Sequence, residues 1–150
     1  MKLSVVSPVY RAELVLDELV ERISKSIPSK FNSYEIILVD DFSSDKSWQK
    51  IVEISKTNIN VRGFKLSRNF GQHYAITAGL NQVTGDYIVV LDCDLQDQPE
   101  EIEKLYLKSK KGFDIVLARR FQRKDSFYKK TVSKSRSFDL ERASSSSKIR

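Results

Sequence analysis

Two carboxylates separated by one residue, Asp92 and Asp94, follow a short apolar run at residues 87–91. A run of this length is too short for a helix and predicts a buried strand whose carboxyl end opens onto a site. Because strand side chains alternate between faces, we expect both carboxylates on one side and Cys93 on the other. At about 5 Å such carboxylates repel each other by roughly 3 kcal/mol with an effective dielectric constant near 20.

A divalent cation bound by Asp92 and Asp94 would remove this repulsion. Oxygen ligands favour hard ions, so the pair predicts Mg²⁺ or Mn²⁺ rather than zinc, with coordination positions left for substrate phosphates. An Asp-x-Asp pair also arises by chance at polar strand ends and turns. The rest of the sequence must therefore decide between a metal site and a simple turn.

Apolar runs and helical periodicities alternate along the chain and predict the elements that position this pair. Strands are expected at residues 3–7, 34–39, 61–66, 87–91 and 113–118. Between them, apolar residues at helical spacing predict helices whose faces include Leu16, Trp48, Ala75 and Ile102. We expect Pro8 to end the first strand, because proline lacks a backbone donor. The alternation predicts an α/β fold with a mostly parallel sheet flanked by helices.

Three of the predicted strands end in polar residues, at Ser7-Pro8, Asp40-Asp41 and Asp92-Cys93-Asp94. In an open parallel sheet, ligands bind beyond the carboxyl ends of the strands, where the strand order reverses. The chain has neither of the glycine-rich motifs that cradle bare phosphate, G-x-x-x-x-G-K and G-x-G-x-x-G. Acidic strand ends suit ribose hydroxyls, base N–H donors and a phosphate-bound metal, which predicts a nucleoside diphosphate with Mg²⁺ or Mn²⁺.

The net charge of +6 comes from the C-terminal part of the sequence. Residues 119–150 hold 11 of the 26 Lys and Arg residues but 3 of the 20 Asp and Glu residues. A basic tail alone fits nucleic acid, anionic lipid or a phosphorylated substrate. Because the preceding part of the chain is acidic, we expect no nucleic-acid partner.

The single cysteine, Cys93, rules out an intrachain disulfide and favours a reducing compartment. No apolar run approaches the 18 residues of a membrane span, so we expect the chain itself to be soluble or peripheral. In the full-length protein we expect a location on the cytoplasmic side, at the membrane surface.

Four motifs, in this order along the chain, resemble the inverting family-2 glycosyltransferases of GT-A fold. They are Val-Val-Ser-Pro-Val-Tyr from Val5, Ile-Leu-Val-Asp-Asp-Phe-Ser-Ser-Asp from Ile37, Asn-Phe-Gly from Asn69, and Leu-Asp-Cys-Asp-Leu-Gln-Asp-Gln-Pro-Glu from Leu91. The last motif most resembles the branch that glycosylates polyprenyl or dolichyl phosphate. The resemblance covers about residues 2–123.

The resemblance implies roles for individual residues. Asp92 and Asp94 match the catalytic metal motif, and Asp41, with Asp40 behind it, matches the acid that reads the base or ribose. The implied substrate-binding residues are Pro8, Tyr10, Glu13, Asp40, Asp41, Asn69, Arg119 and Arg123, the two arginines lying near the diphosphate or the acceptor phosphate. Arg11-Ala12, Phe42 and Cys93 depart from the usual family residues, which are Asn-Glu, glycine and a small residue.

The resemblance implies a metal-dependent transferase that moves a sugar, with inversion, from a nucleoside-diphosphate sugar to a polyprenyl phosphate. A UDP-sugar is favoured over a GDP-sugar as donor. Two alternatives stay open, a family-2 transferase acting on a saccharide hydroxyl in cell-surface polysaccharide synthesis and a catalytically silent nucleotide-binding fragment. We expect a nucleotide-sugar-binding core at residues 1–123 and a basic, Ser-rich tail at 124–150, flexible or part of an incomplete acceptor region.

Overall fold

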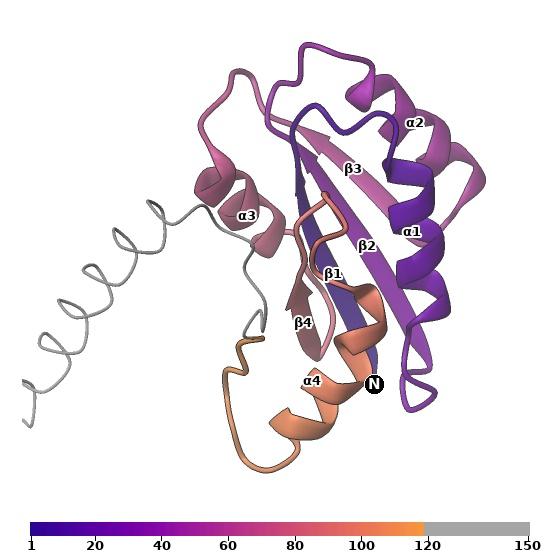
Figure 1. Cartoon of the computed structure of the whole chain (residues 1–150), viewed down its shortest axis with the longest axis vertical. Coiled ribbons are helices and arrows are strands. Elements are labelled where there is room, and N and C mark those ends of the chain that lie inside the picture. Colours follow the sequence, from indigo (N-terminus) through magenta and orange to yellow (C-terminus); the bar gives the residue numbers. More distant parts are fainter. Residues whose placement is uncertain (119–150) are drawn as a thin grey trace, which may run out of the picture. The chain divides into compact units, whose positions relative to one another are not determined.

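The computed structural model describes residues 1–118 (Figure 1). Residues Met1–Val116 form one compact unit, and of the second unit, Leu117–Arg150, only residues 117 and 118 are described. The elements are β1 (Lys2–Val9), α1 (Leu16–Lys25), β2 (Ser33–Asp40), α2 (Ser47–Thr57), β3 (Val61–Lys65), α3 (Gln72–Leu80), β4 (Tyr87–Val90), the short 3₁₀ helix η1 (Pro99–Glu101) and α4 (Ile102–Ser109).

The four strands form one parallel sheet in the order β3-β2-β1-β4. The chain moves outward from β1 through β2 to β3, and then returns to the other side of β1 for β4. The strand order therefore reverses between β1 and β4, which creates a topological switch point at their carboxyl ends. This arrangement confirms the predicted α/β fold with a parallel sheet and flanking helices.

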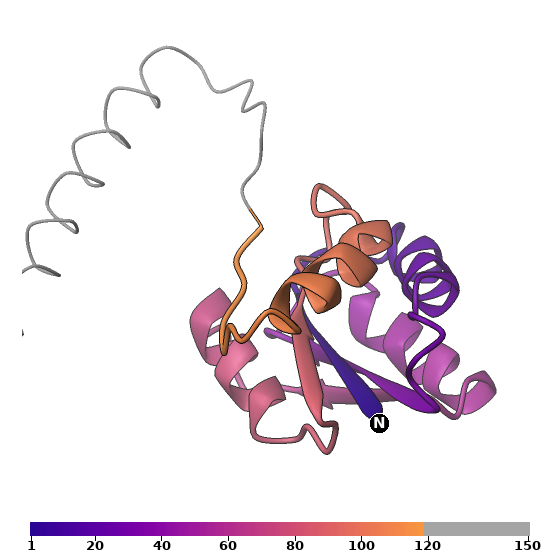
Figure 2. The same cartoon turned by 90° about the horizontal axis from the view of Figure 1, so that it is seen from below.

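Helices cover both faces of the sheet, as Figure 2 shows, with α3 on one face and α1, α2 and α4 on the other. The larger core cluster joins Val5 and Leu38 of the sheet to apolar residues of the three helices, among them Leu19 and Ile51. The smaller cluster packs Ala75 of α3 against strand residues Val6, Ile37 and Val39. Because both faces are buried, β1 and β2 have nearly unbroken apolar sequences.

Strand β1 continues through Pro8 to Val9, so the prediction that Pro8 ends the strand was wrong. The carbonyl of Val6 accepts the last bond from the β4 side, from Leu91, and Pro8 faces the same side two residues later. No ladder bond is needed there, so the missing donor of proline costs nothing.

The predicted fifth strand at residues 113–118 is also wrong, because this segment has no regular structure. Its largest apolar side chains are exposed, with Phe113 50%, Ile115 79% and Leu117 86% accessible. Within residues 1–118, β4 pairs with β1 alone, so no neighbouring strand orders the segment. None of the described helices is long and apolar enough to span a membrane.

Candidate functional site

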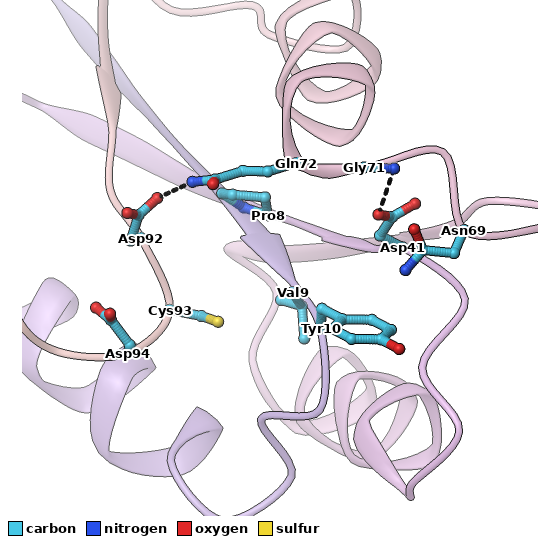
Figure 3. Close-up of a pocket in the computed structure, with 10 residues that line it drawn as sticks. All are labelled: Pro8, Val9, Tyr10, Asp41, Asn69, Gly71, Gln72, Asp92, Cys93 and Asp94. Atoms are coloured by element: carbon cyan, nitrogen blue, oxygen red, sulfur yellow. Dashed lines mark hydrogen bonds between the residues drawn. The ribbon is translucent and has the colours of Figure 1, made fainter. Parts of the chain in front are cut away.

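A pocket of about 410 Å³ lies at the carboxyl ends of the strands, at the switch point between β1 and β4 (Figure 3). All four strands contribute, through the residues that end them or follow them. The lining residues are Pro8, Val9 and Tyr10 from β1 and the loop after it, Asp41 after β2, Asn69, Gly71 and Gln72 between β3 and α3, and Asp92, Cys93 and Asp94 after β4.

Tyr10 presents a half-exposed aromatic ring on one side of the pocket. The Arg11 guanidinium lies 5.2 Å from the centre of this ring, and the Arg11 backbone amide donates to the Ser43 hydroxyl. Arg11 has a φ of 52°, a left-handed conformation that non-glycine residues seldom adopt. The turn after β1 is therefore held to the turn after β2, and the Tyr10 ring is fixed at the pocket edge.

Asp41 joins the end of β2 to the loop before α3. Its carboxylate is buried and accepts backbone hydrogen bonds from Phe70 and Gly71, each 2.8 Å long. Gly71 has φ 94° and ψ 158°, a region open essentially to glycine alone. The Asp41 carboxylate thus fixes the path of the chain into α3 while lining the pocket.

Asp92 receives a hydrogen bond from Gln72, the first residue of α3, with 2.5 Å between Nε2 and Oδ1 (Figure 3). Sequence reasoning missed Gln72, because a lone glutamine at a helix start has no recognisable spacing. The only available signal was its position directly after the predicted Asn-Phe-Gly motif.

Asp94 lies in a turn rather than on a strand, because β4 already ends at Val90. Its Oδ1 accepts a hydrogen bond from the Gln96 backbone amide at 3.0 Å, and Leu95 between them has a φ of 58°. Cys93 points toward Val9 and Tyr10, away from both carboxylates (Figure 3). Burial raises the pKa of the Cys93 thiol, so at neutral pH it is a packing residue.

Two predicted site residues, Asp40 and Glu13, are not among the pocket-lining residues. Asp40 is fully buried; its Oδ1 accepts from the Ser43 backbone amide and its Oδ2 lies 3.8 Å from Lys65 Nζ. Glu13 accepts a 2.7 Å hydrogen bond from the Lys46 backbone amide, at the start of α2. Both acids hold the loop after β2 in place. Arg119 and Arg123 lie outside the described residues.

The pocket therefore gathers three carboxylates, those of Asp41, Asp92 and Asp94, together with one aromatic ring and two side-chain amides. Within residues 1–118, no group of three or more His, Cys, Asp and Glu side chains is arranged to hold a metal ion. A cation bound here would be coordinated by Asp92 and Asp94 and would also need oxygen atoms from a bound small molecule. This pattern is typical of Mg²⁺ and related ions, which are held by one or two carboxylates together with phosphate oxygens.

Comparison with known proteins gives one family match and several structural neighbours. A sequence model described as glycosyl transferase family 2 matches residues 4–148. The S. aureus TarS 1-349 structure has 29% identity and a TM-score of 0.54, with 71% of this chain and 33% of that chain covered. TarS 1-349 in complex with UDP-GlcNAc has 28% identity and a TM-score of 0.54, with coverage of 63% and 27%.

A third neighbour, the mannosyltransferase PcManGT from Pyrobaculum calidifontis, is described in complex with GDP-Man and Mn²⁺. It has 21% identity and a TM-score of 0.55, with 61% of this chain and 27% of that chain covered. This likeness concerns the fold alone. The chain spans a third or less of the length of these neighbours.

Proposed function

Because the chain belongs to glycosyl transferase family 2, we propose that it is the donor-binding half of an inverting glycosyltransferase. The donor is a nucleoside-diphosphate sugar. The observation that carries the proposal is the pocket itself, since the ends of four parallel strands place Asp41, Asp92 and Asp94 around one cavity at the switch point. In this proposal, the donor-binding core comprises residues 1–123. Residues 124–150 form a separate basic tail.

A UDP-sugar is the proposed donor. The TarS fragment that shares 28% identity with the chain is described in complexes with UDP and with UDP-GlcNAc, which supports this choice. In the proposed complex, the exposed face of Tyr10 stacks against the base. Pro8 and Asn69 line the same space, and Asp41, already fixed by backbone donors, keeps lone pairs for ribose or base donors.

Asp92 and Asp94 would hold a divalent cation, Mg²⁺ or Mn²⁺, between the protein and the diphosphate. The residues present fit such an ion, because they offer oxygen ligands only and leave positions for phosphate oxygens. When bound, the ion would neutralise charge on the departing diphosphate. Through such an ion, the two carboxylates would position the diphosphate, and attack on the anomeric carbon from the side opposite this leaving group would invert its configuration.

A polyprenyl phosphate is the proposed acceptor, supported by the extended acidic motif from Leu91 to Glu100. A phosphate monoester has a second pKa of about 6 and is already ionised at neutral pH. Attack by this oxygen needs no strong general base, whereas a saccharide hydroxyl would need one. Arg119 and Arg123 are proposed to neutralise the diphosphate or the acceptor phosphate, and the full-length protein to work at the cytoplasmic membrane surface.

The binding step is tested by calorimetry and thermal unfolding of the 150-residue chain with UDP, UDP-GlcNAc and GDP, each with and without Mn²⁺. A ligand at 100 times its Kd raises the free energy of unfolding by about 2.7 kcal/mol. We expect Mn²⁺-dependent binding of UDP and UDP-GlcNAc that is tighter than binding of GDP. If no nucleotide binds in the presence of Mn²⁺, the proposed function is wrong.

Two variants assign the cation ligand. We expect Asp94→Ala to weaken Mn²⁺-dependent UDP binding by about 10- to 100-fold, whereas Asp97→Ala, in the same loop, should change it by less than about threefold. Equal losses in the two variants would contradict the assignment of Asp94. Transfer of labelled sugar to polyprenyl phosphate, to a saccharide or to neither then separates the proposed acceptor from the two alternatives.

A further inference from the structure

Gln72 joins the first turn of α3 to the acidic loop after β4. Its side-chain amide donates to Asp92 Oδ1 across a sequence separation of 20 residues, and both residues line the pocket. Figure 3 shows the Gln72 side chain extended across the pocket toward Asp92, alongside Pro8. This is a direct side-chain contact between the start of α3 and the loop after β4, two of the segments that build the pocket.

The backbone before Gln72 is fixed by the other buried acid of the pocket. Phe70 and Gly71, the two residues that precede Gln72, both donate to the Asp41 carboxylate. Three consecutive residues, 70–72, therefore connect the acid after β2 to an acid after β4. Because Asp41 sets the path of residues 70 and 71, it also sets the place from which the Gln72 side chain reaches Asp92.

An amide is well suited to hold a carboxylate that must also meet a cation. A lysine or arginine at this position would neutralise Asp92 and repel a divalent ion, whereas a glutamine donates a hydrogen bond and carries no charge. With Oδ1 fixed by Gln72, the carboxylate is limited to a narrow range of orientations. Partners of this kind, which orient a ligand carboxylate, typically contribute 10- to 100-fold to metal affinity.

We infer that Gln72 is a positioning residue that orients Asp92 for the cation and diphosphate of the donor, from a backbone position set by Asp41. This inference rests on the proposed function. Its consequence is that the position of Asp92, after β4, depends on Asp41, after β2, through residues 70–72. A change at residues 70–72 alters cation binding without touching a cation ligand.

The test compares Gln72→Met, which keeps the length of the side chain but removes the donor, with Gln49→Met, at an exposed position of α2. Mn²⁺ binding in the presence of UDP is read from the loss of the electron paramagnetic resonance signal of free Mn²⁺. UDP affinity with and without Mn²⁺ is measured by calorimetry. We expect Gln72→Met to weaken Mn²⁺ binding by about 10- to 100-fold. Metal-free UDP affinity should change by less than about twofold, and Gln49→Met should match the unmodified chain throughout.

The outcomes separate the two proposals. If the unmodified chain binds no Mn²⁺ with UDP, the proposed function fails. If the unmodified chain binds Mn²⁺ and UDP, and Gln72→Met binds Mn²⁺ equally well or more tightly, the inferred role of Gln72 is wrong. The role is also wrong if Gln72→Met and Gln72→Ala each lose as much UDP affinity without Mn²⁺ as with it. Such equal losses would indicate a purely structural role.

Discussion

At the amino edge of the sheet the Glu35 carboxylate is surrounded by cations and hydroxyls, whereas at the carboxyl edge Asp41 and Asp92 receive hydrogen bonds from neutral amides. Both sets of acids are built on or beside the same four strands. The amino-edge carboxylate has its charge balanced inside the protein. The hydrogen bonds to Asp41 and Asp92 orient these carboxylates without adding positive charge. Asp40, at the same edge but outside the pocket, differs from them, because Lys65 Nζ lies 3.8 Å from its Oδ2.

Glu35 shows what full internal compensation requires. Its Oε1 accepts from the Ser4 hydroxyl and from the Thr84 amide and hydroxyl, and its Oε2 lies 3.1 Å from Arg62 and 3.4 Å from Lys2. Burial alone would raise the pKa of Glu35, but hydrogen bonds from Ser4, Thr84 and Arg62 outweigh burial and lower it to about 2. Such a group stabilises the fold and has no remaining capacity for a ligand.

In the described part of the chain, backbone strain at non-glycine residues also lies at the carboxyl edge. Among residues 1–118, the non-glycine residues with positive φ are Arg11, Phe42 and Leu95, and they follow β1, β2 and β4 respectively. Such conformations cost about 1–2 kcal/mol each and persist where surrounding contacts hold them. The comparison therefore divides the sheet into an edge that stabilises the fold and an edge that gives up stability to shape a pocket.

The largest expected effect is the loss of the amino-edge carboxylate. Glu35→Ala leaves Ser4, Thr84 and the two cations without their acceptor, and we expect the free energy of unfolding to fall by about 3–5 kcal/mol. Urea titration measures this loss. Glu103→Ala, at an exposed position of α4, is the matched control and should change stability by less than about 0.5 kcal/mol. If both variants lose a similar amount of stability, Glu35 has no special role in stabilising the amino edge.

Low pH should lower the free energy of unfolding by removing the contribution of Glu35 at the amino edge. A carboxylate whose pKa is lowered by folding stabilises the protein above its unfolded pKa and loses that contribution as the pH falls toward the folded value. For Glu35 the window runs from about 4.5 down to about 2, and the loss is about 3 kcal/mol. Urea titrations at several pH values measure it, and Glu35→Gln should show a flatter dependence on pH. An equally steep dependence in that variant would assign the acid sensitivity to other carboxylates.

A smaller effect on stability is expected at Gly71, which precedes α3 and lines the pocket. Gly71→Ala and Gly112→Ala both place a Cβ in open space but at φ values of 94° and 91°. Each should cost about 1–2 kcal/mol of stability, because alanine is strained in that region. Gly71→Ala alone should also weaken Mn²⁺-dependent UDP binding, measured by calorimetry, since it displaces the donors to Asp41. If the two variants bind UDP equally well in the presence of Mn²⁺, the backbone conformation of Gly71 does not contribute to ligand binding in the pocket.

The sequence was sufficient for β1 and β2 because strands buried on both faces are nearly continuous apolar runs. The edge strands β3 and β4 were also predicted, but they are only partly buried, and Ile88 and Val90 of β4 are 47% and 42% exposed rather than buried as predicted. Residues 113–118 have the same local pattern, but a strand also needs a neighbour, and no local pattern supplies one. The ends of strands were less predictable. β4 stops at Val90, so Asp92 and Asp94 follow turn geometry rather than the alternation of a strand.

The composition of the pocket was predictable in part. Strand periodicity places Asp40 and Asp41 on opposite faces, but it does not tell which face the pocket occupies, and the structure turns Asp41 toward it. The positive φ of Phe42 agrees with what the family resemblance implies, that glycine is usual at this position. Gln72 was beyond prediction because its contact with Asp92 joins the start of α3 to a loop 20 residues further along the chain.

The smallest expected effect is at Phe42, where strain can be removed from the carboxyl edge. Phe42 is 49% exposed with φ 58°, and Lys65 Nζ lies 5.5 Å from its ring. Phe113 is 50% exposed, with Lys108 Nζ at 5.2 Å, but has no positive φ. Both glycine substitutions lose an exposed ring and a cation–π contact, so their difference isolates the backbone strain.

We expect Phe42→Gly to raise the free energy of unfolding by about 0.5–1 kcal/mol relative to Phe113→Gly, as measured by urea titration. Relief of the strain should also loosen the loop after β2, which carries Asp41 into the pocket. UDP binding in the presence of Mn²⁺ should then weaken in Phe42→Gly and stay unchanged in Phe113→Gly. If Phe42→Gly gains stability and keeps its full affinity, the strain at this edge does not serve the pocket, and the two edges differ in charge compensation alone.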